Sequence, residues 1–187
     1  MKGMYKLNLS EKTINSKTIF KGKIINLKVD EVRLPNGKIS SREIVNHPGG
    51  VAIVALTDKN KILLVRQYRK PVEEALLELP AGKLEYNENP IECAKRELIE
   101  ETGYKCDEIK LLTMFYTTPG FSDEKMYLYF AKNLKKEIAQ PDEDEFLELY
   151  EYDLNELKNM ISENKIKDAK TVIGILLYSE MVKVYDI

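Results

Sequence analysis

The segment from about Pro90 to Thr102 constrains this chain more than any other, because its residue spacing predicts both a helix and a chemical surface. Its apolar side chains recur at three- and four-residue intervals, as on the buried face of a helix: Ile91, Ala94, Leu98 and Thr102. Pro90 suits the first turn of a helix, and Gly103 suits a C-terminal cap. The sequence therefore predicts a helix that packs on one side and ends at Thr102.

Three glutamates share one face of this predicted helix: Glu97, Glu100 and Glu101. Their carboxylates project from a single turn and repel one another. Such a cluster is either a solvated acidic face, partly neutralised by Lys95 and Arg96, or a ligand set for a hard cation. Mg²⁺ binds carboxylate and phosphate oxygens together, so the second interpretation predicts metal-assisted phosphate chemistry.

The wider spacing decides between these two interpretations. Gly82, five residues, Glu88, seven residues and then the run from Arg96 to Tyr104 resemble the Nudix box, Gly-x5-Glu-x7-Arg-Glu-U-x-Glu-Glu-x-Gly-U, in which U is bulky and apolar. Tyr104 departs from the usual aliphatic residue at the last position, but it is bulky and can pack. The chain is thus similar to the Nudix hydrolases. The resemblance implies an α/β fold, the Nudix α/β/α sandwich around a mixed sheet.

Roles in the box follow from the resemblance. Glu97, Glu100 and Glu101 would hold one to three Mg²⁺ ions, or Mn²⁺, with help from the backbone carbonyl of Ala81. Glu100 is counted as a catalytic residue as well as a ligand. Gly82 would let the backbone approach the metal closely. Glu88 and Arg96 would form a pair that orients the ligands, an arrangement hardly different from an ordinary salt bridge between helix and loop.

The segments around the box point to a substrate. Glu78–Lys83 and Thr118–Glu124 resemble the ADP-ribose pyrophosphatase branch, whose usual marker is the proline here numbered Pro119. Arg66–Arg69 and Asp168–Thr171 are also similar to that branch. The implied reaction converts ADP-ribose and water to AMP and ribose 5-phosphate. Alternatives are the same chemistry on GDP-mannose, NADH or diadenosine polyphosphate, and a non-catalytic ADP-ribose-binding regulator, which would carry a damaged box or a fused DNA-binding domain.

Substrate contacts are expected at both ends of the ligand. Arg69 is a phosphate or ribose clamp or else a surface salt bridge. Arg42 and Glu43 match a pair that reaches the adenosine end from the partner subunit of a strand-exchanging homodimer, although an exposed strand edge explains them equally well. The resemblance implies that Thr118, Pro119 and Gly120 line the terminal ribose or the phosphates and that Glu124 acts there as a ligand or an orienting group. Plain loop geometry explains these four residues equally well.

A catalytic base is expected outside the box, because glutamates occupied by metal are poor bases. Pro141–Phe146 is an acidic segment, and the resemblance assigns Glu143 as the base and Glu145 as a metal ligand, with a shift of two residues left open. A solvated acidic turn is the alternative.

The remaining pattern predicts the organisation of the chain. Residues 1–48 would form a small β unit for dimerisation, with strands over Phe20–Asn46 and a turn at Pro35–Lys38. Residues 49–187 would form the Nudix domain. Its strands and C-terminal helices are expected at Val51–Leu56, Ile62–Gln67, Ile109–Thr117, Met126–Lys132, Phe146–Tyr150, Leu154–Glu163 and Ala169–Val182.

Composition excludes several classes of protein. Lys+Arg 29 against Asp+Glu 31 argues against bulk attraction to nucleic acid. No apolar run approaches the roughly 20 residues that a membrane span requires. Cys93 and Cys106 are expected as reduced thiols of a cytoplasmic protein, with Cys93 packing rather than acting as a nucleophile. His47, the single histidine, leaves no His-based zinc site and is expected in a loop or core role more than at the substrate.

Overall fold

The apolar run Gly50–Ala55 forms strand β4, in which every residue is buried. In the computed structural model, which describes residues 8–139 and 146–185, β4 pairs in parallel with β9 (Lys125–Lys136) and antiparallel with β7 (Ala81–Lys83). Strand β8 (Tyr104–Tyr116) completes a sheet of order β7-β4-β9-β8. The sheet is therefore mixed, as predicted.

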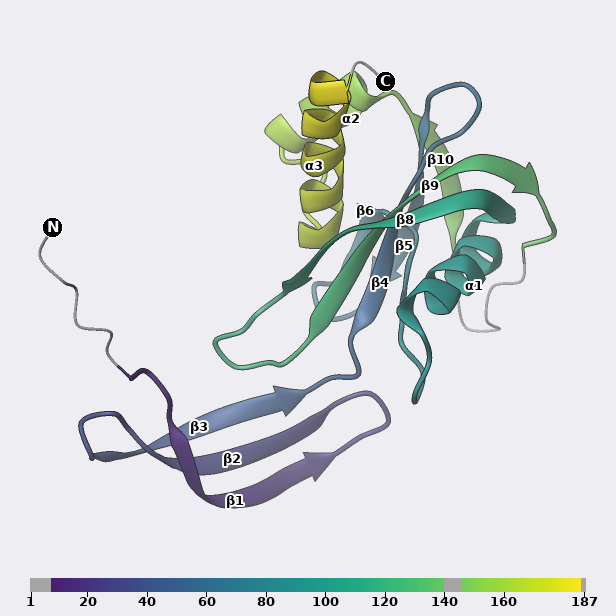
Figure 1. Cartoon of the computed structure of the whole chain (residues 1–187). Coiled ribbons are helices and arrows are strands. Elements are labelled where there is room, and N and C mark those ends of the chain that lie inside the picture. The colour runs from purple at the N-terminus through teal and green to yellow at the C-terminus, as the bar shows by residue number, and fades with distance from the viewer. Residues whose placement is uncertain (1–7, 140–145, 186–187) are drawn as a thin grey trace, which may run out of the picture. The chain divides into compact units, whose positions relative to one another are not determined.

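Helices cover both faces of this sheet (Figure 1). Successive side chains of a strand point to opposite faces, and β4 accordingly contributes Val51 and Ile53 to one apolar cluster and Ala52 and Val54 to another. Helix α1 (Pro90–Thr102) packs in the first cluster. Helices α2 (Leu154–Ser162) and α3 (Ala169–Tyr185) pack in the second. This arrangement confirms the predicted α/β/α sandwich.

Three further strands form a second sheet. Strands β5 (Ile62–Arg69), β6 (Glu74–Glu78) and β10 (Glu148–Tyr152) are all antiparallel, in the order β10-β5-β6. Strand β6 was not predicted, because its five residues lie in a stretch dominated by glutamates. This sheet carries Arg69 and Glu78 on adjacent strands.

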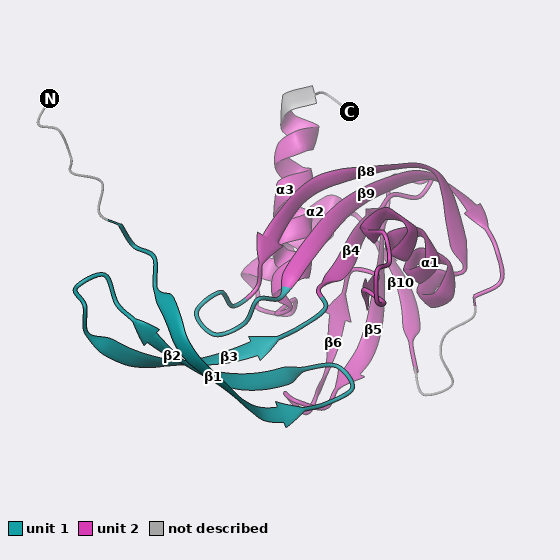
Figure 2. Ribbon diagram, turned by 60° about the horizontal axis from the view of Figure 1, so that its bottom comes forward, with its two compact units in different colours: residues 1–48, 118–124 teal, residues 49–117, 125–187 magenta. Residues whose placement is uncertain are grey.

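A third sheet belongs to a separate compact unit (Figure 2). Strands β1 (Lys12–Lys21), β2 (Asn26–Arg33) and β3 (Ile39–Asn46) form an antiparallel meander. The predicted turn follows β2, with Gly37 at a φ of 85°. The unit comprises residues 1–48 together with 118–124, and residues 49–117 and 125–187 form the other unit. The division is thus not a single cut in the chain.

The boundaries of helix α1 agree with the prediction at both ends. Strand β1 begins earlier than expected, since Lys12–Lys21 is largely polar and all ten of its residues are exposed. Strands β8 and β9 extend well beyond the predicted ranges, because their pairing with each other continues from Tyr104 to Tyr116. Within the described ranges, no helix is long and apolar enough to cross a membrane.

Candidate active site

Local capping fixes the acidic face of α1. The Asn89 side chain accepts a hydrogen bond from the Ile91 N–H at 3.2 Å, which caps the N-terminus. Gly103 closes the helix in the left-handed region, at a φ of 68°, and its N–H donates to the Ile99 carbonyl at 2.8 Å. The helix therefore ends directly after Glu101 and Thr102, and its last two turns carry the glutamates.

Arg96 is the centre of the charge arrangement on α1. Its Nε and Nη2 donate to the two carboxylate oxygens of Glu88, at 3.0 and 3.1 Å. Its Nη1 donates to both Glu97 and Glu100, at 2.8 Å each. One guanidinium thus offsets the repulsion among neighbouring carboxylates, and the structure brings together the pair that the sequence suggested. These hydrogen bonds, first of all the one to Glu88, raise the pKa of Arg96.

Strand β7 meets the same face of the helix through Ala81 and Gly82. The Ala81 N–H donates to Glu101 Oε2 at 2.9 Å. A Cβ added to Gly82 would lie 1.8 Å from Cδ of Glu97, far inside van der Waals contact. Only glycine therefore fits at this position while Glu97 keeps its place. The backbone of β7 thus adjoins Glu97 and Glu101, and Arg96 links Glu97 to Glu100.

The carboxylates are held by protein donors as the side chains stand. Among the described residues, no three acidic, histidine or cysteine side chains converge closely enough to hold a metal ion. Two of the three glutamates contact Arg96, and the third contacts the Ala81 amide. Their chemistry still suits a hard cation, because all three are carboxylates and one of them, Glu97, adjoins a backbone that a Cβ would obstruct.

A buried ion cluster lies on the neighbouring sheet. Arg69 donates to both oxygens of Glu78, at 2.8 Å each, and Lys170 also donates to Glu78. Burial alone would raise the pKa of Glu78, but the hydrogen bonds and charges of these two cations lower it below its usual value. The pKa of Arg69 is raised, mainly by Glu78 and in smaller part by Glu101. Arg69 therefore lies within electrostatic reach of the box.

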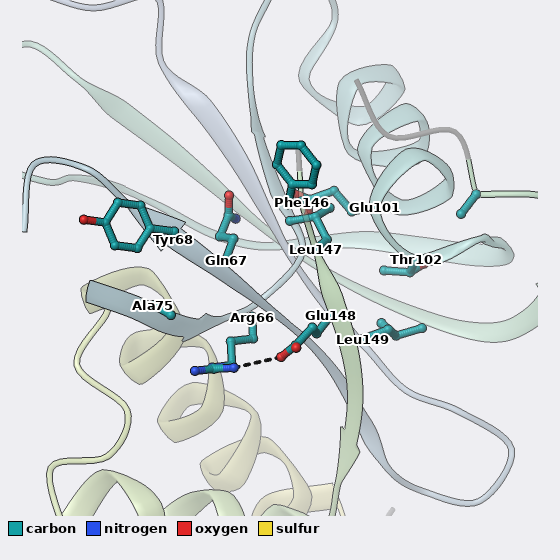
Figure 3. A pocket seen from close by; sticks show the side chains of 11 residues that line it. Arg66, Gln67, Tyr68, Ala75, Glu101, Thr102, Phe146, Leu147, Glu148 and Leu149 are labelled. Atoms are coloured by element: carbon teal, nitrogen blue, oxygen red, sulfur yellow. Dashed lines mark hydrogen bonds and ion pairs between the residues drawn. The ribbon is translucent and has the colours of Figure 1, made fainter. Parts of the chain in front are cut away.

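A cavity of about 590 Å³ opens beside Glu101 (Figure 3). It is lined by Arg66, Gln67, Tyr68, Ala75, Glu101, Thr102, Ala139, Phe146, Leu147, Glu148 and Leu149. Arg66 and Glu148 form an ion pair across it, at 2.9 Å. Phe146 and Tyr68 expose aromatic rings there. The cavity combines one box carboxylate with aromatic and polar groups, as a ligand pocket requires.

The other predicted substrate residues belong to the first unit. The loop that contains Thr118, Pro119 and Gly120 is joined to β3 by two backbone hydrogen bonds, from Val45 N–H to the Phe121 carbonyl and from Asp123 N–H to the Val45 carbonyl. Asp123 also accepts from the Asn46 side chain and the His47 N–H, at 2.7 and 2.9 Å. Glu124 lies 3.4 Å from Nδ1 of His47.

Arg42 and Glu43 are neighbours on β3, so their side chains leave opposite faces of the strand. The guanidinium of Arg42 binds both oxygens of Glu11, at 2.8 and 2.6 Å. Glu43 is exposed. A ligand bound at one face of β3 could therefore contact only one of these two side chains.

Glu143 and Glu145 lie outside the described residues. The residues on either side of their segment, Ala139 and Phe146, both line the cavity beside Glu101.

Both cysteines are free thiols. Cys93 is fully buried, and burial raises the pKa of its thiol to about 12, so it packs in the core and is no nucleophile at neutral pH.

Sequence reasoning missed the residues that support the site from a distance. Gln67, Tyr68 and Phe146 lie in segments singled out from the sequence, but none of the three was predicted to have a role, and Phe146 joins the other two in one cavity only in the folded chain. Thr171 and Asp168 were noticed only as part of a family resemblance. Their contacts with the box segment span about ninety residues of sequence, as in the hydrogen bond from Leu79 to Thr171.

The Glu88–Arg96 pair predicts a pH-dependent contribution to stability. Arg96 lowers the pKa of Glu88 from 4.5 to about 2. Because the folded pKa is the lower one, ionised Glu88 stabilises the fold above pH 4.5, and this contribution is lost as the pH falls toward 2. Glu88→Gln should reduce the free energy of unfolding by about 1 kcal/mol at pH 7.

Urea denaturation of the wild type and Glu88→Gln between pH 7 and pH 2.5, without divalent metal, measures this effect. Glu85→Gln, a change at an exposed glutamate of the same loop, is the matched control and should leave the stability unchanged. A difference between wild type and Glu88→Gln that stays constant over this pH range would contradict the prediction.

The sequence and the fold of this chain match those of known proteins. Residues 46–172 match the NUDIX domain, and residues 11–45 match the nucleoside diphosphate sugar hydrolase N-terminal domain. The chain is 53% identical to the methanol dehydrogenase activator of Bacillus methanolicus, over 88% of this chain and 90% of that protein. It is 48% identical to the ADP-ribose pyrophosphatase of Bacillus subtilis (strain 168), over 90% and 92%. A crystal structure of an ADP compounds hydrolase has the same fold, with a TM-score of 0.85 at 22% identity, over 97% of this chain and 98% of that chain. With a complete box from Gly82 to Tyr104 and a family match over most of its length, the chain belongs to the Nudix hydrolase family.

Proposed function

We propose that this Nudix pyrophosphohydrolase cleaves ADP-ribose to AMP and ribose 5-phosphate with the help of Mg²⁺. The observation that carries the proposal is the single site formed by three glutamates of α1 and the Ala81–Gly82 backbone of β7. The match of residues 11–45 to the N-terminal domain of nucleoside diphosphate sugar hydrolases supports the substrate class. The name of the relative that is 48% identical supports ADP-ribose within that class.

Glu97, Glu100, Glu101 and the Ala81 carbonyl would hold the metal, for which Mn²⁺ is a substitute. Bound there, it would neutralise pyrophosphate charge and lower the pKa of water. To bind the metal, Glu97 and Glu100 would leave their hydrogen bonds to Arg96. Glu88 would keep the guanidinium in place through its two hydrogen bonds. Gly82 leaves room for Glu97 to turn toward the metal.

Proton transfer is assigned to Glu143 or Glu145. The described residues that flank their segment, Ala139 and Phe146, line the cavity beside Glu101, which supports this assignment. Arg69 is assigned to the phosphates, because its charge lies within reach of Glu101. The loop of Thr118, Pro119, Gly120 and Glu124 is assigned to the substrate on resemblance to the ADP-ribose branch.

Loss of one box carboxylate should remove the activity. Glu101→Gln keeps the size of the side chain but weakens its affinity for a cation, so kcat/KM for ADP-ribose should fall by about 10³-fold with Mg²⁺. Glu92→Gln, on an exposed position of the same helix, is the matched control and should keep full activity. Release of the nucleoside monophosphate, which is GMP from GDP-mannose and AMP from ADP-ribose, NADH and diadenosine polyphosphate, measures both the rate and the preference with Mg²⁺ and with Mn²⁺. A fully active Glu101→Gln enzyme would rule out the metal assignment.

Gly82→Ala tests the close approach of β7 to the box. Its methyl group would overlap Glu97, so Glu97 or the strand must move, and kcat should fall by about 10²-fold. Gly37→Asn is the control, since asparagine tolerates a positive φ and nothing lies within 4 Å of an added Cβ there. If Gly82→Ala were as active as Gly37→Asn, the backbone would have no need to approach the metal site.

A second candidate role follows from the relative that is 53% identical, a methanol dehydrogenase activator. In that role the same site would act in the presence of a dehydrogenase. Adding this protein and Mg²⁺ to a purified methanol dehydrogenase, with Glu101→Gln in parallel, tests it. Stimulation by the wild type alone supports the role, and equal rates with both proteins exclude it.

We also propose that the β1–β3 unit forms a homodimer in which Arg42 and Glu43 serve the partner's site. Exposed apolar side chains on this small sheet support an interface: Ile14, Ile19, Phe20, Ile24 and Ile39. An isolated sheet of this size buries little of its own apolar surface. A second copy would cover it.

Light scattering should therefore give a mass twice the 21.6 kDa of one chain. Ile14→Glu should shift the equilibrium to monomer, whereas Lys12→Glu on the same strand should not. Mixing inactive Glu101→Gln and Arg42→Ala subunits provides the sharper measurement. If Arg42 acts across the interface, the mixed dimer regains one intact site and activity returns. A monomeric wild type, or mixtures that remain inactive, would contradict the proposal.

A further inference from the structure

Helix α3 contacts the backbone between β6 and β7 through a buried hydroxyl. Thr171 is fully buried, and its Oγ1 accepts a hydrogen bond from the Leu79 N–H at 2.8 Å. The same hydroxyl donates to Asp168 Oδ2 at 2.6 Å. Asp168 Oδ2 also accepts from the Thr171 N–H at 3.0 Å, which fixes the start of α3. The hydroxyl thus needs both its acceptor and its donor function.

The segment that Thr171 holds is short and is fixed at every residue. Glu78 is bound by Arg69 and Lys170 through its side chain. Pro80 accepts from the Ile53 N–H at 2.9 Å through its carbonyl. The next residue, Ala81, donates its N–H to Glu101. Leu79 has its own anchor in Thr171, two residues before the amide that orients a box carboxylate.

Helix α3 packs on Leu79 at a second point, one turn farther along. A Cβ added to Gly174 would lie 2.5 Å from a methyl carbon of Leu79. Residues 171 and 174 are three apart and therefore share one face of the helix. The helix thus contacts both the backbone and the side chain of Leu79. Because the two are closely packed, we expect a change at Thr171 to shift the Leu79 backbone.

We infer that Thr171 is a positioning residue for the metal site: with Asp168, it sets the place of the Leu79–Ala81 backbone against Glu101. This inference rests on the proposed function for its kinetic consequences. Thr171 touches neither the box glutamates nor the reacting atoms in the described contacts, so it acts through Leu79. A hydroxyl is required, and its methyl group is not.

Two substitutions at this position separate the hydroxyl from the shape of the side chain. Thr171→Val keeps the shape but leaves the Leu79 N–H without its acceptor. It should lower kcat/KM for ADP-ribose by about 10- to 100-fold, mainly through kcat and the Mg²⁺ activation constant, with KM for ADP-ribose changed by less than about threefold. Thr171→Ser keeps the hydroxyl and should stay within about threefold of the wild type.

Affinity for Mn²⁺, measured by EPR titration of the protein without substrate, gives a readout independent of turnover. Thr171→Val should bind Mn²⁺ at least about fivefold more weakly than the wild type, and Glu101→Gln defines the loss of the site. Thr57→Val is the matched control: Thr57 is also buried and its hydroxyl accepts from the Lys61 N–H, but in the β4–β5 turn. Both valine variants should lower Tm by several degrees, while only Thr171→Val should weaken Mn²⁺ binding.

If Thr171→Val does not fold, Asp168→Asn is measured in the same way. This substitution weakens the acceptor of the Thr171 hydroxyl and should also weaken Mn²⁺ binding.

The outcomes separate the two proposals. Unchanged Mn²⁺ affinity and kcat in folded Thr171→Val or Asp168→Asn, or equal losses in Thr57→Val, would overturn the positioning role and leave the hydrolase intact. A wild type without activity on ADP-ribose would overturn the proposed substrate, and the Mn²⁺ affinities would still decide the positioning role.

Discussion

The structure of the catalytic unit depends on how three glutamates are tolerated on one turn of a helix. Like charges at this spacing destabilise an isolated helix. Here Arg96 contacts two of them and the Ala81 amide contacts the third, while Glu88 holds the guanidinium from the adjoining loop. The compensation requires strand β7 to lie directly against α1, and therefore a glycine at position 82. The box residues that carry no metal role are thus the ones that make the acidic face compatible with folding.

The box and most of the residues proposed for substrate recognition belong to different parts of the chain. All box residues and the cavity beside Glu101 are in the unit of residues 49–117 and 125–187, whereas Arg42, Glu43 and the Pro119 loop are in the other. The Pro119 loop is tied to β3 by hydrogen bonds at Val45 and Asp123. If the proposed roles hold, sequence changes in the first unit would alter which group is recognised without changing the box itself.

The parts of the fold that follow from local spacing could be predicted from the sequence. Helix α1, its C-terminal glycine cap and the buried run of β4 depend on residues close together in the sequence. The limits of α1 agree with the structure, and β4 lies one residue earlier than predicted at each end. Strands β6 and β7 could not be predicted, because the glutamates, Pro80 and Gly82 around them suggest a loop until pairing with β5 and β4 supplies their partners. The contact between Thr171 and Leu79 could not be predicted from the sequence either, because it exists only after α3 packs on the sheet.

Arg69 shows how a structure can resolve alternatives that a sequence leaves open. The sequence allowed a phosphate clamp or a salt bridge, and the guanidinium does form a salt bridge, with the buried Glu78. That bond uses Nε and one hydrogen of Nη2, so the opposite edge of the planar group, Nη1 with the second hydrogen of Nη2, is held in a fixed direction. Since Glu78 is also bound by Lys170, its position does not depend on Arg69 alone. A salt bridge of this kind is compatible with the proposed clamp, because holding the guanidinium in place would lower the entropy lost when its remaining edge binds an oxyanion.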